Sequence, residues 1–131
     1  PAHPEVSASL ARLQAGGLRL FSLTNSTLQV AQAQLSNAGR SQYFEQILSA
    51  DEVKRLKPAE EPYHMAAQRA GVDVSSIRLI AAHSWDVAGA MRAGCATAFV
   101  ARPGMVLDPL VQKPDIIGAN LQEVAEQILA G

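Results

Sequence analysis

The chain has 131 residues, with 11 Lys and Arg against 12 Asp and Glu and a formal net charge of -1. These values are typical of a single globular domain, and a balanced charge without runs of one sign argues against binding to nucleic acid or to a membrane surface. No apolar stretch approaches the roughly 20 residues that span a bilayer, and no leader with a cleavage site is recognisable. We therefore expect a cytoplasmic protein.

Apolar residues alternate along the chain between helical spacing and short continuous runs, with glycines between the segments. Helices are predicted around residues 6–13, 28–38, 63–70, 86–93 and 121–128, and strands at residues 18–23, 46–50, 77–82 and 97–101. Residues 77–82 are expected to form the most buried strand. Gly71 and Gly94 are placed to end helices, and Asn120 with Glu123 three residues on resembles a capping box that begins the last helix.

Helices that alternate with short apolar strands predict parallel βα units, and therefore an α/β fold with a three-layer, Rossmann-like parallel sheet flanked by helices. Residues 102–114, which contain three prolines, are expected to be an irregular loop. Its Met105, Val106, Leu107 and Leu110 are too apolar for a free linker. We expect this loop to pack over the edge of the sheet or to contact a partner.

Ligands of parallel α/β sheets bind beyond the carboxyl ends of the strands. Three polar segments follow predicted strands in this chain: residues 24–26, 51–57 and 83–86. These segments hold the candidate functional residues.

Each candidate also has a structural explanation. Thr24 can direct its hydroxyl at an anionic group or cap a helix. Lys57 stands before Pro58, which fits the first position of a helix, and is either a cation at the mouth of the sheet or an ordinary exposed lysine. Asp86 either caps a helix or holds a lysine, a metal or a water, and His83 is either a general base or a hydrogen-bonded histidine at a strand end.

Taken together, these segments resemble the haloacid dehalogenase (HAD) superfamily of aspartate-nucleophile hydrolases, most closely the type II, or L-2-haloacid, dehalogenase branch. The residues that carry the resemblance are LTNS at 23–26, KP at 57–58 with Tyr63 six residues after the lysine, AAHSWDVAGA at 81–90 and FVARPG at 99–104. A hydroxyl, a lysine and an aspartate, each after a strand, match the second to fourth motifs of the superfamily. The resemblance covers nearly the whole chain.

The resemblance implies a catalytic role for Thr24, Lys57 and Asp86. Thr24 and the Asn25 amide would hold the carboxylate or phosphate oxygens of a small anionic substrate. Lys57 would neutralise the attacking carboxylate and the charge of the transition state. Asp86 would orient Lys57 and help to position the hydrolytic water, or would ligate magnesium in a phosphatase. No cofactor is expected for a dehalogenase.

The resemblance also implies that Tyr63, Trp85 and His83 lie near the substrate. Tyr63 and Trp85 match positions near the pocket of the dehalogenase branch, although either side chain can also belong to the core. Ala81 and His83 stand where the branch tends to have Ser and Asn, so the polar relay to the water would differ: either His83 takes over hydrogen bonding, or the enzyme works on another substrate. Cys95, the single cysteine, is expected to be a buried, inert thiol.

The first motif of the superfamily, a strand that ends in the attacking aspartate, has no match in residues 1–131. The resemblance therefore implies that these residues are the C-terminal part of one HAD-like core domain, without the first strand and the cap domain. The missing strand would lie between the strands that precede Thr24 and His83, and two unpaired strand edges would face the slot it leaves. We expect residues 1–131 alone to be inactive, and to be either a homo-oligomer through this slot or marginally stable.

Three other hypotheses remain from the sequence. A magnesium-dependent phosphatase of the same superfamily would use the metal to gather phosphate oxygens. A catalytically inactive, truncated α/β module would bind a protein through its open sheet edge or its apolar loop. A receiver-type phospho-acceptor domain also combines Asp, Thr and Lys, but it needs an early acidic cluster and a late lysine, and this chain has neither.

Overall fold

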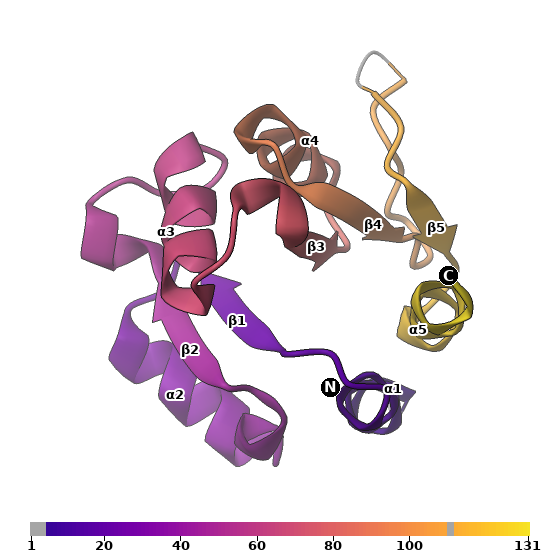
Figure 1. The fold of residues 1–131 in the computed structure, drawn as a ribbon, viewed down its shortest axis with the longest axis horizontal. Coiled ribbons are helices and arrows are strands. Elements are labelled where there is room, and N and C mark those ends of the chain that lie inside the picture. Colours follow the sequence, from indigo (N-terminus) through magenta and orange to yellow (C-terminus); the bar gives the residue numbers. More distant parts are fainter. Residues whose placement is uncertain (1–4, 110–111) are drawn as a thin grey trace.

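The computed structural model describes residues 5–109 and 112–131 (Figure 1). Its helices are α1 (Glu5–Ala15), α2 (Leu28–Asn37), α3 (Glu60–Ala70), α4 (Ser84–Ala93) and α5 (Leu121–Ala130). Its strands are β1 (Phe21–Thr24), β2 (Gln46–Ser49), β3 (Arg78–Ala81), β4 (Ala96–Val100) and β5 (Ile116–Gly118). Short 3-10 turns occupy residues 41–43, 50–53 and 74–76.

The strands form two separate parallel sheets. β1 pairs with β2, and β4 pairs with β3 on one edge and with β5 on the other. β1 and β3 are therefore each paired on one edge only, and in Figure 1 they lie next to each other across the middle of the molecule. The parallel α/β architecture is confirmed, and the division into two sheets matches the expected slot.

Helices cover both sides of the strands (Figure 1). α3 and α4 pack together on one side, while α1 and α5 pack together on the other and α2 contacts β2. One core cluster joins α1, α5 and β4 through the buried residues Leu10, Ala98, Val100, Leu121 and Val124. A second, smaller cluster joins α3 and α4 through Tyr63, Ala90, Ala93 and Cys95. Burial of these apolar side chains is the main force that holds the layers together.

The predicted helix ends are confirmed where a residue has a specific backbone role. Gly71 and Gly94 follow α3 and α4 with φ angles of 73° and 102°, a left-handed conformation that glycine adopts without steric cost. Asn120 Oδ1 accepts a hydrogen bond from the Glu123 amide at 2.9 Å, and Glu123 Oε1 accepts one from the Ala119 amide. These bonds satisfy amides that the first turn of α5 leaves free.

The predictions about the strands were wrong in three details. β1 begins at Phe21 rather than at Leu18, because the Leu18 amide still bonds to the Leu13 carbonyl in the turn that closes α1. β3 is not the most buried strand: Arg78 is exposed, whereas β4, which has a neighbour on both edges, is buried over four of its five residues. β5 was not predicted at all.

Two helix starts also differ from the prediction. α4 begins at Ser84, so Asp86 lies inside its first turn and does not cap it, and the capping position is held by His83. α3 begins at Glu60, so Pro58 precedes the helix rather than occupying its first position.

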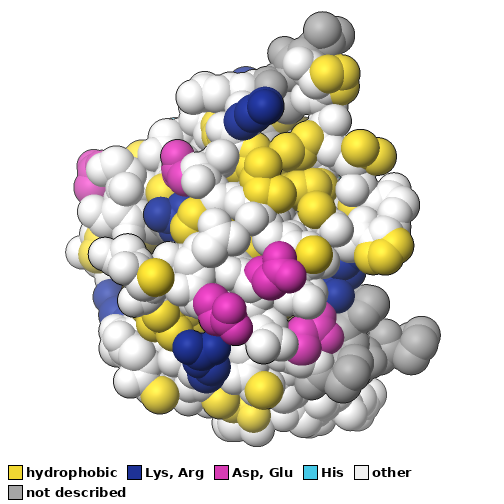
Figure 2. Space-filling view, turned by 90° about the vertical axis from the view of Figure 1, so that its right-hand side faces the viewer, with side chains coloured by type: hydrophobic (Ala, Val, Ile, Leu, Met, Phe, Trp, Pro, Cys, Tyr) yellow, Lys and Arg dark blue, Asp and Glu magenta, His cyan; other side chains and the backbone are white. Residues whose placement is uncertain are grey.

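The loop is irregular over residues 102–109 and 112–114, as predicted, but its apolar side chains are not all packed. Val106 is 80% exposed and Met105 41%, whereas Leu107 is half-buried. Leu110 lies outside the described residues. Figure 2 looks at the side of the molecule where β5 and α5 lie, and hydrophobic side chains gather on this face. None of the helices that the structure describes is long and apolar enough to cross a membrane.

Candidate active site

Lys57 and Asp86 form a buried ion pair at the carboxyl end of β1. The Lys57 ammonium donates to Asp86 Oδ2 at 2.8 Å, and each side chain is only 9% exposed. The same ammonium donates to the carbonyl oxygen of Leu23, near the end of β1. Lys57 is therefore not the exposed loop lysine that the sequence also allowed. Its neighbours Lys54 and Arg55 are exposed and pair with Asp51 and Glu61 at the surface.

Tyr63 holds the other oxygen of the Asp86 carboxylate. Its hydroxyl donates to Asp86 Oδ1 at 2.5 Å and lies 3.1 Å from the Asp86 carbonyl oxygen. Burial raises the pKa of the Tyr63 phenol far above its ordinary value, and the hydrogen bond to Asp86 raises it further. Tyr63 therefore stays a neutral donor. With one oxygen bonded to Tyr63 and the other to Lys57, the carboxylate is fixed in orientation.

Asn25 holds the backbone of Lys57 from the side of β1. Its Oδ1 accepts from the Lys57 amide at 2.8 Å, and its Nδ2 donates to the Lys57 carbonyl at 3.1 Å. Thr24 lies beside it, where its hydroxyl accepts a bond from the Ser26 amide, and the cap of α2 is Thr27 rather than Thr24. The Lys57–Pro58 peptide bond is cis. The end of β1, the Lys57 loop and the first turn of α4 are far apart in sequence but meet at this site.

Trp85 and His83 form the exposed rim of this site. Trp85 is 46% exposed, so it is not a core residue, and the Lys57 ammonium lies 5.8 Å from the centre of its ring. His83 is also exposed, and its ring lies 5.9 Å from that of Trp85 in a tilted arrangement. These rings give the charged site an aromatic edge that solvent can reach.

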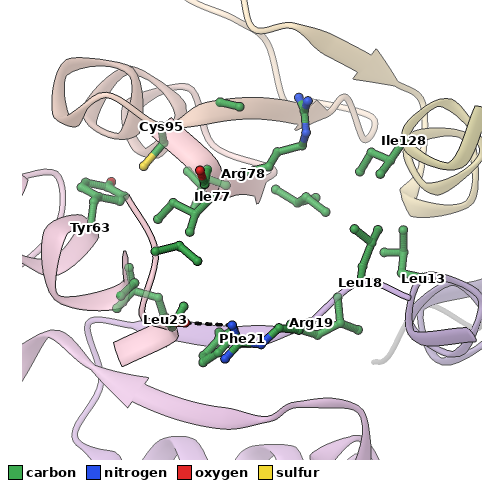
Figure 3. Close-up of a pocket in the computed structure, with 18 of the residues that line it drawn as sticks. Leu13, Leu18, Arg19, Phe21, Leu23, Tyr63, Ile77, Arg78, Cys95 and Ile128 are labelled. Atoms are coloured by element: carbon green, nitrogen blue, oxygen red, sulfur yellow. Dashed lines mark hydrogen bonds between the residues drawn. The ribbon is translucent and has the colours of Figure 1, made fainter. Parts of the chain in front are cut away.

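A cavity of about 590 Å³ separates the two sheets. Side chains of β1 and β3 line it from opposite sides, and Leu13, Leu18 and Ile128 close it on the side of α1 and α5 (Figure 3). Tyr63 and Cys95 lie at the other end, where α3 and α4 meet. Most of the lining side chains are apolar, and the unpaired edges of β1 and β3 supply backbone groups that can pair with a further strand.

The thiol of Cys95 lies at the inner end of the cavity. Burial raises the pKa of the Cys95 thiol from 9.0 to about 11, with the negative charge of Asp86 contributing, so Cys95 is a protonated core thiol at neutral pH, as predicted. In the part of the chain that the structure describes, no three side chains of His, Cys, Asp or Glu come together as metal ligands.

The sequence indicated Lys57, Asp86 and Tyr63, but it missed the bond between Asp86 and Tyr63 and the contacts from Asn25 to Lys57. No local pattern reports contacts across 23 and 32 residues. The only available signal was the place of each residue after a strand or on the first turns of a helix.

The comparisons with known proteins identify the family. The model of the family described as haloacid dehalogenase-like hydrolase matches residues 1–100. The chain belongs to this family. The (S)-2-haloacid dehalogenase of Pseudomonas sp. (strain YL) is 36% identical to it over 122 residues, which are 93% of this chain and 53% of that protein. Phosphoglycolate phosphatase of Neisseria meningitidis is 31% identical over 130 residues, or 96% of this chain and 55% of that one.

The solved structure of L-2-haloacid dehalogenase from Xanthobacter autotrophicus with chloropropionic acid covalently bound shares the fold of this HAD-like chain. Its TM-score is 0.89 at 23% identity, over 96% of this chain and 60% of that one. Similarity to 2-haloacid dehalogenases is thus seen in sequence, at 36% identity, and in fold. The chain spans about half the length of the curated relatives that it matches.

Proposed function

We propose that this protein acts in the hydrolytic dehalogenation of small 2-haloacids, with Lys57 as the fixed cation of the site. The attacking aspartate would come from a segment outside residues 1–131. The observation that carries the proposal is the buried pair of Lys57 and Asp86, 2.8 Å apart beside a cavity between two unpaired strands. The curated relative named (S)-2-haloacid dehalogenase supports the choice of substrate class.

The proposed reaction has two steps. A carboxylate oxygen of the aspartate attacks C2 of the haloacid, an ester bond forms, and the carbon–halogen bond breaks as halide leaves with the electron pair. Water then adds to the carbonyl carbon of the ester, and cleavage of the acyl–oxygen bond releases the 2-hydroxy acid and the free aspartate. One water is consumed, and one halide and one proton are released.

Lys57 would stabilise the attacking carboxylate. An ammonium has three N–H groups, and within the described residues two of them point at Asp86 and at the Leu23 carbonyl. The third would donate to the carboxylate of the added segment. At 9% exposure the charge acts in a medium of low polarity, so its effect on a nearby carboxylate is much stronger than in water.

The other candidates surround this cation. We propose that Thr24 and the Asn25 backbone amide bind the substrate carboxylate, and that Trp85 and His83 form the outer wall of the substrate site. Tyr63 would contribute through its buried ring and through its bond to Asp86. Asp86 would hold Lys57 in place and help to position the water of the second step.

The cavity offers a place for the segment that carries the aspartate. We propose that this segment enters as an extended strand between β1 and β3, parallel to both, and pairs with their open edges. Its carboxyl end would then lie beside Thr24 and Lys57, where the neighbouring strands end.

A magnesium-dependent phosphatase is the alternative within the family, and the similarity to a phosphoglycolate phosphatase keeps it open. It would require Asp86 to bind the metal. Both oxygens of Asp86 already have hydrogen-bond donors, from Lys57 and Tyr63, which favours the metal-free displacement.

The test compares two lysines of the same loop in a version of the protein that carries the upstream segment. Lys57→Met should lower halide release from (S)-2-chloropropionate by about 100- to 1000-fold, because it removes the charge that faces the nucleophile. Lys54→Met removes an exposed lysine three residues earlier and should leave the rate unchanged. Equal rates for the two variants would contradict the proposal.

A chelator separates the two members of the family. Halide release should be the same with and without excess EDTA, and p-nitrophenyl phosphate should not be hydrolysed when magnesium is added. Phosphate release that depends on magnesium, without halide release, would favour the phosphatase.

A further inference from the structure

Helix α4 lies close to the Lys57 loop at Gly89, a buried residue in the middle of the helix. A Cβ atom at this position would lie 2.6 Å from Pro58 Cβ, 2.9 Å from the Pro58 carbonyl oxygen and 2.9 Å from the Tyr63 hydroxyl. Real Cβ atoms do not approach other atoms so closely, so an alanine here would force a neighbour to move. The backbone of Pro58 is among these neighbours and cannot rotate away as the end of a side chain can.

The groups around Gly89 are the same groups that hold Asp86. Gly89 lies three residues after Asp86, on the same face of α4. Pro58 follows Lys57 directly, and Tyr63 donates to Asp86 Oδ1. The absent side chain at position 89 therefore sets how near both partners of the carboxylate come to the helix that carries it.

Other glycines of the chain have different roles. Gly71 and Gly94 are needed for their positive φ angles, and a Cβ at Gly16 would lie within 3.0 Å only of a methyl group of Leu129, the end of a flexible side chain. Gly89 has no positive φ angle and sits where alanine is the better helix former. Its presence is explained by the close contact and not by the local backbone.

The Lys57 loop is also held by Asn25. Asn25 makes two hydrogen bonds to the backbone of Lys57, the residue that precedes Pro58, and these bonds restrain the loop. A push from position 89 is therefore not absorbed by a simple shift of the loop toward β1. The displacement passes to the contacts among Lys57, Tyr63 and Asp86.

We propose that Gly89 is a positioning residue for the Lys57–Asp86 pair: its lack of a side chain lets α4 come close enough for Asp86 to reach Lys57 and Tyr63 together. The proposal rests on the proposed function for its effect on rate. Its effect on geometry can be measured without any reaction.

Trp85 is the probe of the geometry, because it is the single tryptophan of the chain and its ring lies 5.8 Å from the Lys57 ammonium. Gly89→Ala should shift the Trp85 emission in the same direction as Lys57→Met does. The matched control is Gly118→Ala, where a Cβ would meet Val124 Cγ2 and Val124 N at 2.9 Å, in the contact between β5 and α5. Gly118→Ala should lower the melting temperature but leave the Trp85 emission unchanged.

The rate is measured in the version that carries the upstream segment. Gly89→Ala should lower kcat for halide release by about 10- to 100-fold with little change in KM, because a small displacement of a charge in an active site has effects of this size. Gly118→Ala should keep the kcat of the parent at a temperature where both are folded. A Gly89→Ala variant with the parent's kcat and Trp85 emission overturns the proposal. Absence of halide release from the parent itself would contradict the proposed function, and the emission would still decide the role of Gly89.

A double-mutant cycle covers the case in which Gly89→Ala folds poorly. Tyr63→Phe removes the hydroxyl that would lie 2.9 Å from the new Cβ, so Gly89→Ala should be less damaging in the Tyr63→Phe background than in the parent. Melting temperature and Trp85 emission are recorded for all four proteins. Effects that simply add would contradict the proposed contact.

Discussion

The two parallel sheets, which are called the two halves below, differ in burial, although both are built from similar short apolar strands. In the half formed by β3, β4 and β5, the middle strand β4 has neighbours on both edges and is almost completely buried. In the half formed by β1 and β2, all four residues of β1 are partly exposed, and β1 borders the cavity. The difference shows that burial of a strand here follows from its neighbours more than from its own hydrophobicity.

The site lies where the two halves meet. Asn25 belongs to the first half, Asp86 to the second, and Lys57 connects them through its backbone and its ammonium. The packing of α3 against α4 makes the same connection within the helical layer. The catalytic candidates therefore also hold the two halves together.

The largest expected effect is on the free energy of unfolding. It compares the loss of one phenylalanine side chain from each half. Phe99 in β4 is 1% exposed, and Phe99→Ala should lower the free energy of unfolding by about 4 kcal/mol through loss of burial and a cavity. Phe21 in β1 is half-buried at the cavity, and Phe21→Ala should cost only ~1 kcal/mol. Urea unfolding measures both. Equal losses would mean that β1 is as well packed as β4.

The connection between the halves is tested at Tyr63. Tyr63→Phe keeps the ring but removes the donor to the buried Asp86 carboxylate, and should cost about 2 kcal/mol of stability. Tyr43→Phe changes the only other tyrosine, whose ring packs on the core cluster of α1 and β4. We expect it to be nearly neutral in the same urea experiment. A neutral Tyr63→Phe would contradict the assigned hydrogen bond.

Helix caps provide a smaller comparison. Asn120 caps α5 with an amide at 2.9 Å, and Thr27 caps α2 with an amide at 3.4 Å. Asn120→Ala should lower the free energy of unfolding by about 1 kcal/mol, and Thr27→Ala by less, because its bond is longer. Thermal melts followed by circular dichroism rank the two variants. The reverse order would contradict the assignment of the shorter hydrogen bond as the stronger cap.

At neutral pH the smallest effect is that of Cys95, because its thiol changes the stability only above about pH 9. Its pKa is about 11 in the folded chain, above the ordinary value, so the unfolded chain loses this proton first as the pH rises. The contribution to stability is complete below about pH 9 and is lost between about pH 9 and 11. Comparison of the parent with Cys95→Ala across this range isolates it. Rapid alkylation of the native thiol by iodoacetamide at pH 8 would contradict the raised pKa.

Features fixed by local chemistry were predictable from the sequence. Gly71 and Gly94 end helices because glycine adopts the left-handed conformation, and Asn120 begins a helix because its side chain bonds an amide within one turn. The alternation of apolar runs and helical faces was enough to predict the parallel α/β fold. The type and order of the helices and of β1 to β4 therefore followed from neighbours in the sequence, and only β5 was missed among the described strands.

Features that depend on distant contacts were not predictable in the same way. The apolar run at residues 77–82 gives no sign that β3 lacks a neighbour on one edge, so its burial was overestimated. The sequence pattern predicted that Asp86 begins a helix. Only the fold shows that its carboxylate bonds to Lys57 and Tyr63. The brevity of β5, three residues long, left no periodic signal.

The central claim is that the site on this chain completes a dehalogenase only together with an aspartate from outside residues 1–131. The most direct test is halide release from (S)-2-chloropropionate by the purified 13.9 kDa chain, verified by intact mass, beside a version that carries the upstream segment. We predict no release by the 13.9 kDa chain and sustained release by the longer version. Release by the 13.9 kDa chain that disappears in Lys57→Ala would contradict the claim.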